Sequence, residues 1–253
     1  MKKPFLVCLP QTAASNAQVV EQICCQEEAL VLDNGFYTVR AFYRKEGRIK
    51  YISHLDMNRC ISRDLKRSGL PVWHTLGFNS HIYLTFALPL SLGYESLCDS
   101  FDFRLTREMD LEMARKQLAA VLPEGLTVYR LAKPVEKPEK IAFADYDIFQ
   151  EFCKDAAIVQ AQLKEWLSRP EILLEKKTKK SQKEIDVKPL FTLKKLEEQG
   201  ENLFLSLRCS AGGTCHLNPT FLLDAFAAET GNPPDWARVI RTAVLNDAGE
   251  PWV

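Results

Sequence analysis

The sequence lacks the short motifs that mark common cofactor and nucleotide sites. It has no Gly-rich P-loop, no dinucleotide-binding fingerprint and no nucleophile elbow. It also lacks the CxxxCxxC spacing of a radical S-adenosylmethionine cluster, and its eight cysteines do not follow a zinc-finger spacing. These absences argue against the chemistries that such motifs mark, and we expect neither a metal nor a cofactor.

Net charge and long apolar runs are absent as well. Lys+Arg and Asp+Glu both total 33, so any anion binding must come from local patches rather than from the net charge. No stretch is long and apolar enough to span a bilayer. The apolar run at 5–9 is too short for a signal peptide, and Pro10 ends it. We therefore expect a soluble cytoplasmic protein that does not bind membranes and whose cysteines are free thiols.

Hydrophobic alternation and helix signals predict an α+β fold. The order of elements over 36–132 is strand, helix, strand, strand, helix, strand, which is the ferredoxin-like βαββαβ pattern. A charged, Pro-rich linker is predicted at 133–140, and the pattern recurs after it. The prediction is thus an N-terminal extension (1–35) followed by tandem ferredoxin-like units with antiparallel sheets (36–132 and 141–253). The segment 239–245 could be a final strand or a short helix.

The helix predicted over 53–67 opens with a possible polar site. Ser53 and Asp56 have the spacing of a capping box, so both have a structural explanation that needs no catalysis. His54 lies in the first turn, where the helix dipole favours a neutral imidazole. This suits hydrogen bonding, general base work or simple packing.

Arginines recur at every fourth residue of the same helix. Arg59, Arg63 and Arg67 form a basic stripe. It can be a solvated helix face whose charges pair with Asp56 and Asp64, or an edge that binds phosphate.

A Gly-Phe-Asn-Ser-His loop leads into the strand predicted over 81–88. Its Gly and Asn permit backbone conformations that point N–H groups at an anion, which makes Asn79 and His81 candidate binding residues. Alternation places His81 and Tyr83 on the face opposite the apolar residues, and Arg104 on the neighbouring strand could share that face. Aromatic rings and arginine on an open sheet suit stacking with unpaired bases, unless the face packs on the second half of the chain.

A lysine-rich segment in the second half is a further candidate for contact with a phosphate backbone. It can equally be a flexible, solvated loop. The predicted binding residues there are Lys176, Lys177, Lys179 and Lys180.

Three segments of the chain resemble a known family. They are RKEGRIKYISHLDMNRCISRDLKRSGLP, GFNSHIYLTFALPLSLGYES and KEIDVKPL, and they are similar to the bacterial radical SAM-linked proteins. That family is an uncharacterised domain found beside, or fused to, cobalamin-binding radical SAM proteins. Lys188 and Asn218 stand where the family has arginines, which weakens the case for a bidentate anion site in the second half. The resemblance implies a radical SAM protein as partner, in RNA modification or a ribosome-related process.

Three functions remain open from the sequence. The first is a non-catalytic RNA-binding or substrate-presenting partner of a radical SAM protein, with tRNA or rRNA as the RNA. The second is a metal-free RNA endonuclease that resembles CRISPR repeat-processing nucleases, in which His54 or His81 would be the base. The third is a protein-interaction scaffold. We favour the first, in which the protein is not an enzyme on its own.

Overall fold

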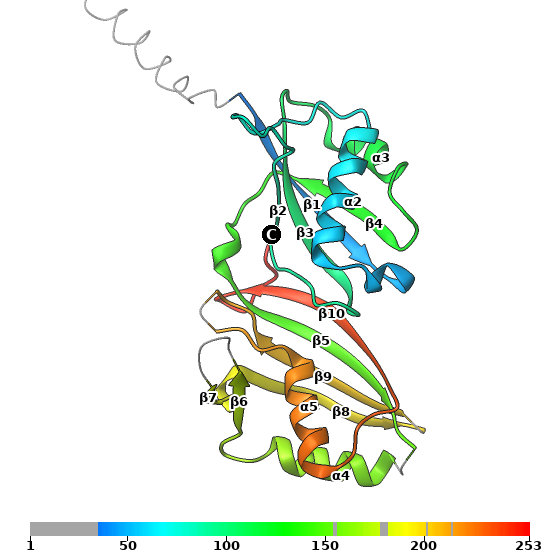
Figure 1. Cartoon of the computed structure of the whole chain (residues 1–253), viewed down its shortest axis with the longest axis vertical. Helices are drawn as coiled ribbons and strands as arrows, with labels where there is room; N and C mark the ends of the chain where they lie inside the picture. The colour runs from blue at the N-terminus through cyan, green and yellow to red at the C-terminus, as the bar shows by residue number, and fades with distance from the viewer. Residues whose placement is uncertain (1–34, 154–155, 178–181, 201, 214) are drawn as a thin grey trace, which may run out of the picture. The chain divides into compact units, whose positions relative to one another are not determined.

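Two successive sets of strands and helices make up the chain from Phe36 to Val253, which forms one compact unit (Figure 1). The computed structural model describes residues 35–153, 156–177, 182–200, 202–213 and 215–253. The predicted N-terminal extension therefore lies outside the described residues, except for Gly35. Within the described residues the fold is α+β, with four α-helices and a large, mostly antiparallel sheet.

The elements of the first half alternate as the sequence predicts. They are β1 (Tyr37–Lys45), the 3-10 helix η1 (Gly47–Tyr51), α2 (His54–Arg67), β2 (Leu84–Phe86), β3 (Glu95–Leu105), α3 (Leu111–Ala119) and β4 (Leu126–Ala132). The second half adds a two-stranded hairpin, β6–β7, between its first helix and second long strand. Its elements are η2 (Pro138–Lys140), β5 (Ile141–Glu151), α4 (Ala156–Leu167), β6 (Leu173–Lys177), β7 (Gln182–Asp186), η3 (Lys188–Leu190), β8 (Phe191–Gln199), β9 (Asn202–Ser210), α5 (Pro219–Thr230) and β10 (Trp236–Asn246).

Polar side chains fix where the helices begin. The Asp110 carboxylate accepts a hydrogen bond of 2.7 Å from the Met113 N–H at the start of α3. Asn218 accepts from the Thr220 N–H at the start of α5, where Pro219 occupies the first helical position. Each cap satisfies a backbone donor that the helix itself leaves unpaired, which is why these residues mark helix starts in the sequence.

One sheet runs through both halves. The strand order is β4-β1-β3-β10-β5-β9-β8, and β2 pairs with β3 beside this path. Neighbours are antiparallel except at the junction, where β3 and β10 are parallel and pair Glu95 with Ile240 and Ser96 with Arg241. The last strand of the chain, β10 (red in Figure 1), therefore connects the two halves.

Each half has its own hydrophobic core between its helices and one face of its strands. Phe101 and Phe103 of β3 are fully buried against Ile61 of α2 and Leu118 of α3. The second core joins Ile148 of β5 to residues of α4 and α5. Because side chains alternate along a strand, the residues between these core positions lie on the opposite side of the sheet, which we call the helix-free face.

A buried ion pair crosses the junction. The Arg241 guanidinium donates to Asp99 (2.8 Å) and to the carbonyls of Leu88 (2.9 Å) and Pro89 (3.0 Å), with both side chains of the pair 2% exposed. Removal of one partner of such a pair leaves an uncompensated buried charge and typically costs about 3–5 kcal/mol. Arg241 thus fastens the second half both to β3, through Asp99, and to the chain before β3, through Leu88 and Pro89.

Two predicted strands differ in the structure. The strand expected over 81–88 shrinks to β2, because Ile82 pairs with His74 and the carbonyls of Leu88 and Pro89 accept from Arg241. The segment 239–245 is part of strand β10 and not a helix, because it pairs with β5 along its length.

The predicted linker 133–140 contains the 3-10 helix η2, and it contacts the end of the chain, because the Glu136 N–H donates to the Val253 carbonyl.

Candidate functional site

Helix α2 begins at Ser53, whose hydroxyl accepts from the Asp56 N–H (3.1 Å) and donates to the Asp56 carboxylate (2.8 Å). Arg59 also donates to Asp56, at 3.0 Å. The hydrogen bonds from Ser53 and Arg59 hold the pKa of Asp56 below its ordinary value. Ser53 and Asp56 therefore have a complete structural role at the helix start.

His54 follows this cap on the exposed surface. Its ring meets the edge of the Phe86 ring, with 5.0 Å between centroids. His81 lies on a different segment, in the loop that leads to β2, so the two histidines are separate candidate bases.

The three arginines of α2 are exposed, and two of them pair with acids of the same helix. Arg59 binds Asp56 at 3.0 Å and Arg67 binds Asp64 at 3.5 Å, with both arginine side chains 68% exposed. The Arg59–Asp56 pair is exposed on both sides and adds little to stability, whereas Asp64 is itself buried. Arg63 is exposed and has no ion pair within the described residues. The stripe is thus mainly a solvated helix face with one unpaired cation.

The loop 75–81 is held in shape by His81. The His81 Nδ1 lies 3.1 Å from the Thr75 hydroxyl and 3.0 Å from the Asn79 carbonyl. The His81 N–H donates to the Thr75 hydroxyl (3.1 Å), and the Thr75 N–H donates to the His81 carbonyl (2.8 Å). His81 is therefore exposed but already has partners for Nδ1, and its visible role is to close the loop.

Arg104 lies at the base of this loop, between aromatic rings. Its guanidinium carbon is 3.7 Å from the ring centroids of both Phe36 and Tyr83, and 5.2 Å from that of Trp73. Its Nε is buried without a hydrogen-bond partner, and no carboxylate within the described residues pairs with the group. Rings on both sides fix the orientation of the guanidinium, while its charge stays unpaired.

Two further arginines on the helix-free face also lie on rings. The guanidinium carbon of Arg130 is 4.2 Å from the Phe42 centroid, and that of Arg44 is 5.7 Å from the Tyr129 centroid. Neither has an ion pair within the described part of the chain. We call Arg44, Arg104, Arg130 and their rings the arginine–aromatic face.

Arg40 occupies the middle of the same face in a different way. It is 1% exposed, binds Asp102 through two hydrogen bonds (2.7 and 2.9 Å) and donates to the Glu136 carbonyl (2.9 Å). The Trp252 ring covers it at 4.0 Å. Trp252, from the C-terminal segment of the second half, thus covers the centre of the helix-free face.

The alternation of β1 could have revealed part of this face, because Arg40, Phe42 and Arg44 recur at every second residue. Arg130 and Tyr129 give no such signal. They lie where β1 and β4 shift register between Phe42 and Tyr43, an irregularity that only the pairing defines.

The lysine-rich segment falls on the β6–β7 hairpin. Lys176 and Lys177 belong to β6, and their backbone pairs with Lys183 and Gln182 of β7. Lys179 and Lys180 lie outside the described residues.

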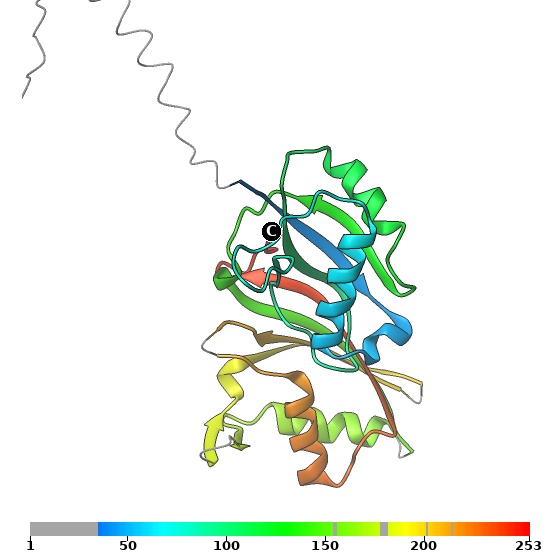
Figure 2. The ribbon, with the colours of Figure 1, turned by 45° about the horizontal axis from the view of Figure 1, so that its top comes forward.

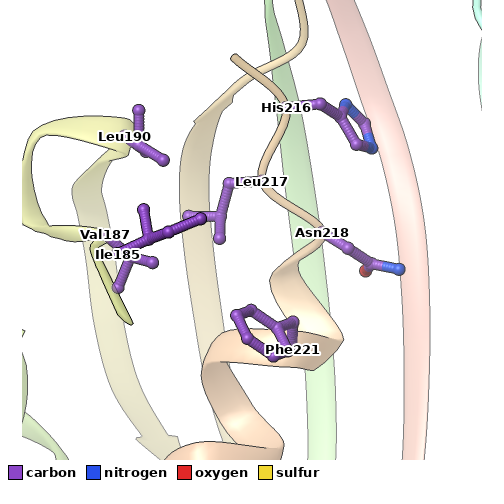
Figure 3. Close-up of a pocket in the computed structure, with 7 residues that line it drawn as sticks. All are labelled: Ile185, Val187, Leu190, His216, Leu217, Asn218 and Phe221. Atoms are coloured by element: carbon purple, nitrogen blue, oxygen red, sulfur yellow. The ribbon is translucent and has the colours of Figure 1, made fainter. Parts of the chain in front are cut away.

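A cavity of about 230 Å³ lies near the start of α5 (Figure 3). Ile185, Val187, Leu190, Leu217 and Phe221 make its wall largely apolar, and His216 and Asn218 complete the lining. Figure 3 shows the Asn218 side chain pointing away from Val187. Its Nδ2 donates to the Ser91 hydroxyl (3.1 Å) and its Oδ1 accepts from the Tyr94 hydroxyl. Asn218 therefore ties α5 to the first half and presents no free polar group to the cavity.

Three thiols of the described structure, Cys60, Cys98 and Cys209, are not poised for nucleophilic catalysis. Burial raises the pKa of Cys98 and Cys209 to about 12, and burial together with Asp64 raises that of Cys60 to about 11. These groups are protonated near neutral pH. Within the described residues, no three His, Cys, Asp or Glu side chains gather in a way that could hold a metal ion.

Among the residues that the structure covers, no helix has the length and apolar character needed to cross a membrane. No curated protein matches the chain significantly.

Two solved structures resemble the chain distantly. One is a Cbf5-Nop10-Gar1 complex, with 11% identity, a TM-score of 0.45 and coverage of 82% of this chain and 49% of that one. This chain thus spans about half the length of the matched chain. The other is an unknown protein from Galdieria sulphuraria, with 14% identity, a TM-score of 0.25 and coverage of 81% and 98%.

A family comparison covers most of the chain, from β1 to the first residue of α5. The match runs over residues 38–219, and the chain belongs to the family described as an uncharacterized protein conserved in bacteria (DUF2344).

Proposed function

We propose that this protein binds RNA on the arginine–aromatic face and presents it to a partner enzyme, without catalysing a reaction itself. The observation that carries the proposal is the state of Arg44, Arg104 and Arg130. Each lies within 6 Å of an aromatic ring, and none has a carboxylate partner within the described residues. Single-stranded RNA offers the matching chemistry, because its phosphates pair with guanidinium groups and its unpaired bases stack on rings and on arginine.

The architecture supports the same proposal. The first half has the element order βαββαβ and the strand order β4-β1-β3-β2, and the second half has the strand order β10-β5-β9-β8 with β6 and β7 outside it. We propose that the halves are tandem ferredoxin-like units, the second of which carries the β6–β7 hairpin as an insertion. In this arrangement the helices of the first unit cover one face of its strands and leave the arginine–aromatic face for a ligand.

The partner and the kind of RNA follow from the resemblance of the sequence. We propose a radical SAM protein as the partner enzyme, tRNA or rRNA as the RNA, and the cytoplasm as the place of action. The alternative is an endonuclease in which His54 or His81 would be the base; of the two, His81 has its Nδ1 engaged in the loop.

The test compares two variants with the same change in net charge. One is Arg44→Gln/Arg104→Gln/Arg130→Gln, and the other is Arg59→Gln/Arg63→Gln/Arg67→Gln on α2. Binding of total tRNA and of a single-stranded RNA is measured by fluorescence anisotropy over a range of salt concentrations. We expect the first variant to lose about tenfold or more in affinity at 0.1 M salt and to show a weaker salt dependence.

The α2 variant is expected to lose much less. A greater loss in that variant would move the interface to α2. Wild-type protein that binds no RNA at low salt, alone or with its partner, would overturn the proposal and favour a protein-interaction scaffold.

A further inference from the structure

We infer that the loop 75–81 presents Phe78 as a stacking platform for an unpaired RNA base, next to the cation of Arg104. The inference rests on the proposed function and deepens it, because it names the form of RNA that the site would take.

Phe78 is exposed to an unusual degree. Its relative exposure is 105%, and that of Leu76 in the same loop is 89%. An exposed large aromatic ring gains nothing from burial in the folded monomer, whereas contact with a ligand would remove its apolar surface from water.

The loop that carries Phe78 is nevertheless well held. Four hydrogen bonds between Thr75, Asn79 and His81 close it, as described above. Gly77, just before the ring, has φ of 123°, a conformation that other residues rarely adopt. A ring on an ordered loop loses less conformational entropy on binding than one on a floppy segment. The loop thus offers a preorganised aromatic surface.

The same loop starts and ends beside Arg104. Trp73, two residues before Thr75, and Tyr83, two residues after His81, both contact its guanidinium. The Trp73 N–H donates to the Arg104 carbonyl (2.8 Å), which anchors the loop to β3. An unpaired cation therefore lies at the base of the loop, and the exposed ring lies near its tip.

Charge in this part of the chain favours a polyanion over other partners. No aspartate or glutamate occurs between Asp64 and Glu95, in a protein that has 33 acidic residues. The segment contains Lys66, Arg67, His74 and His81. A nucleotide can stack its base on Phe78 while a neighbouring phosphate meets Arg104, without repulsion from an acid within the segment.

The ring also selects the form of the RNA. A base inside a duplex has both faces covered by its neighbours, and the deep major groove of A-form RNA does not admit side chains. Stacking on Phe78 therefore requires a base in a loop, a bulge or a single strand.

The experiment uses the full chain and two RNAs of equal length, a hairpin with an unpaired loop and a fully paired duplex. The loop carries 2-aminopurine, whose fluorescence reports stacking. The variants are Phe78→Ala, Phe78→Trp and, as a matched control in the same loop, Leu76→Ala. Thermal unfolding of each variant verifies that the fold is retained.

We expect Phe78→Ala to lower affinity for the hairpin by roughly 5- to 100-fold, from the usual effect of removing one stacking ring, and to abolish the fluorescence change. Binding to the duplex should be weak and the same in all variants. Phe78→Trp should bind the hairpin like the wild type, and the affinity of Leu76→Ala should stay within about twofold of it.

If Phe78→Ala binds the hairpin normally while the Arg44/Arg104/Arg130 variant does not, the inference fails and the proposed function stands. Equal losses in Phe78→Ala and Leu76→Ala would also overturn it. Absence of wild-type RNA binding would overturn the proposed function itself.

Discussion

The helix-free faces of the two halves carry similar numbers of cations but use them differently. On the second half, Arg208 and Lys194 both bind the Asp145 carboxylate at 2.8 Å, and Arg238 binds Glu95 at 2.6 Å. Asp145 and Glu95 are almost fully buried. On the first half, Arg44, Arg104 and Arg130 lie on aromatic rings without a carboxylate in the described structure. The second face pairs these cations with carboxylates of the fold, whereas on the first face only Arg40 is paired in this way.

The exposure of an arginine does not show whether its charge is already paired with a carboxylate. Arg59 of α2 is 68% exposed yet already paired, whereas Arg104 is partly buried and unpaired. A count of surface arginines would rank α2 first. The partner of each guanidinium, rather than its exposure, indicates which arginines are free to bind phosphate.

The largest expected effect concerns Arg40, the one arginine of the first face that is itself buried and paired with a carboxylate. Arg40→Ala would leave Asp102, whose side chain is 13% exposed, without its partner, so we expect the free energy of unfolding to fall by up to about 3 kcal/mol. Arg44→Ala, at an exposed position on the same strand, should change it by less than about 1 kcal/mol. Urea denaturation measures both, and similar values for the two variants would break the distinction between paired and ring-bound arginines.

A smaller effect is expected from freeing cations on the second face. Asp145→Asn releases Arg208 and Lys194 from their carboxylate, and we expect RNA affinity to rise about two- to fivefold. Asp147→Asn is the control, since it removes the same charge from the neighbouring part of β5 and has no ion pair in the described structure. An equal rise in both variants would show that net charge alone controls affinity.

The smallest effect is a dependence on acidic pH. Burial raises the pKa of Asp145, but hydrogen bonds from Arg208 and Lys194 outweigh it and hold the pKa below its ordinary value. A lowered pKa stabilises the fold above the ordinary value of about 3.9, and this contribution disappears as pH falls through the folded-state pKa. The denaturation midpoint of Asp145→Asn should therefore change less between pH 6 and pH 3 than that of the wild type. If the midpoints of the wild type and of Asp145→Asn changed equally with pH, the lowered pKa of Asp145 would be contradicted.

Local features of the fold were predictable from the sequence, and non-local ones were not. Ser53, Asp110 and Asn218 each start a helix where a capping residue predicts it, because a cap involves only neighbouring backbone groups. The segment 239–245 was ambiguous, because its strand conformation depends on pairing with β5, almost a hundred residues earlier.

The candidate site was likewise predictable in part, where it depends on alternation along a strand, and not where it depends on the tertiary fold. Alternation along the strands predicts that Tyr83 and Arg104 share a face, and the structure places them in contact. The contributions of Phe36 and Trp73 to the same cluster, and the carboxylate of Asp102 on Arg40, come from segments whose proximity only the tertiary fold defines.

The position of β10 also has a consequence for how the protein is made. This strand follows all other strands of the sheet in the chain, yet it lies between β3 and β5. Until the ribosome has released it, the edge of β3 that will receive β10 and one full edge of β5 have no partner. Exposed strand edges readily pair with other chains, and long-range pairings form slowly. Nascent chains should therefore pass through an aggregation-prone stage that ends only when β10 inserts, which makes chaperone capture during synthesis an expected part of the life of this protein.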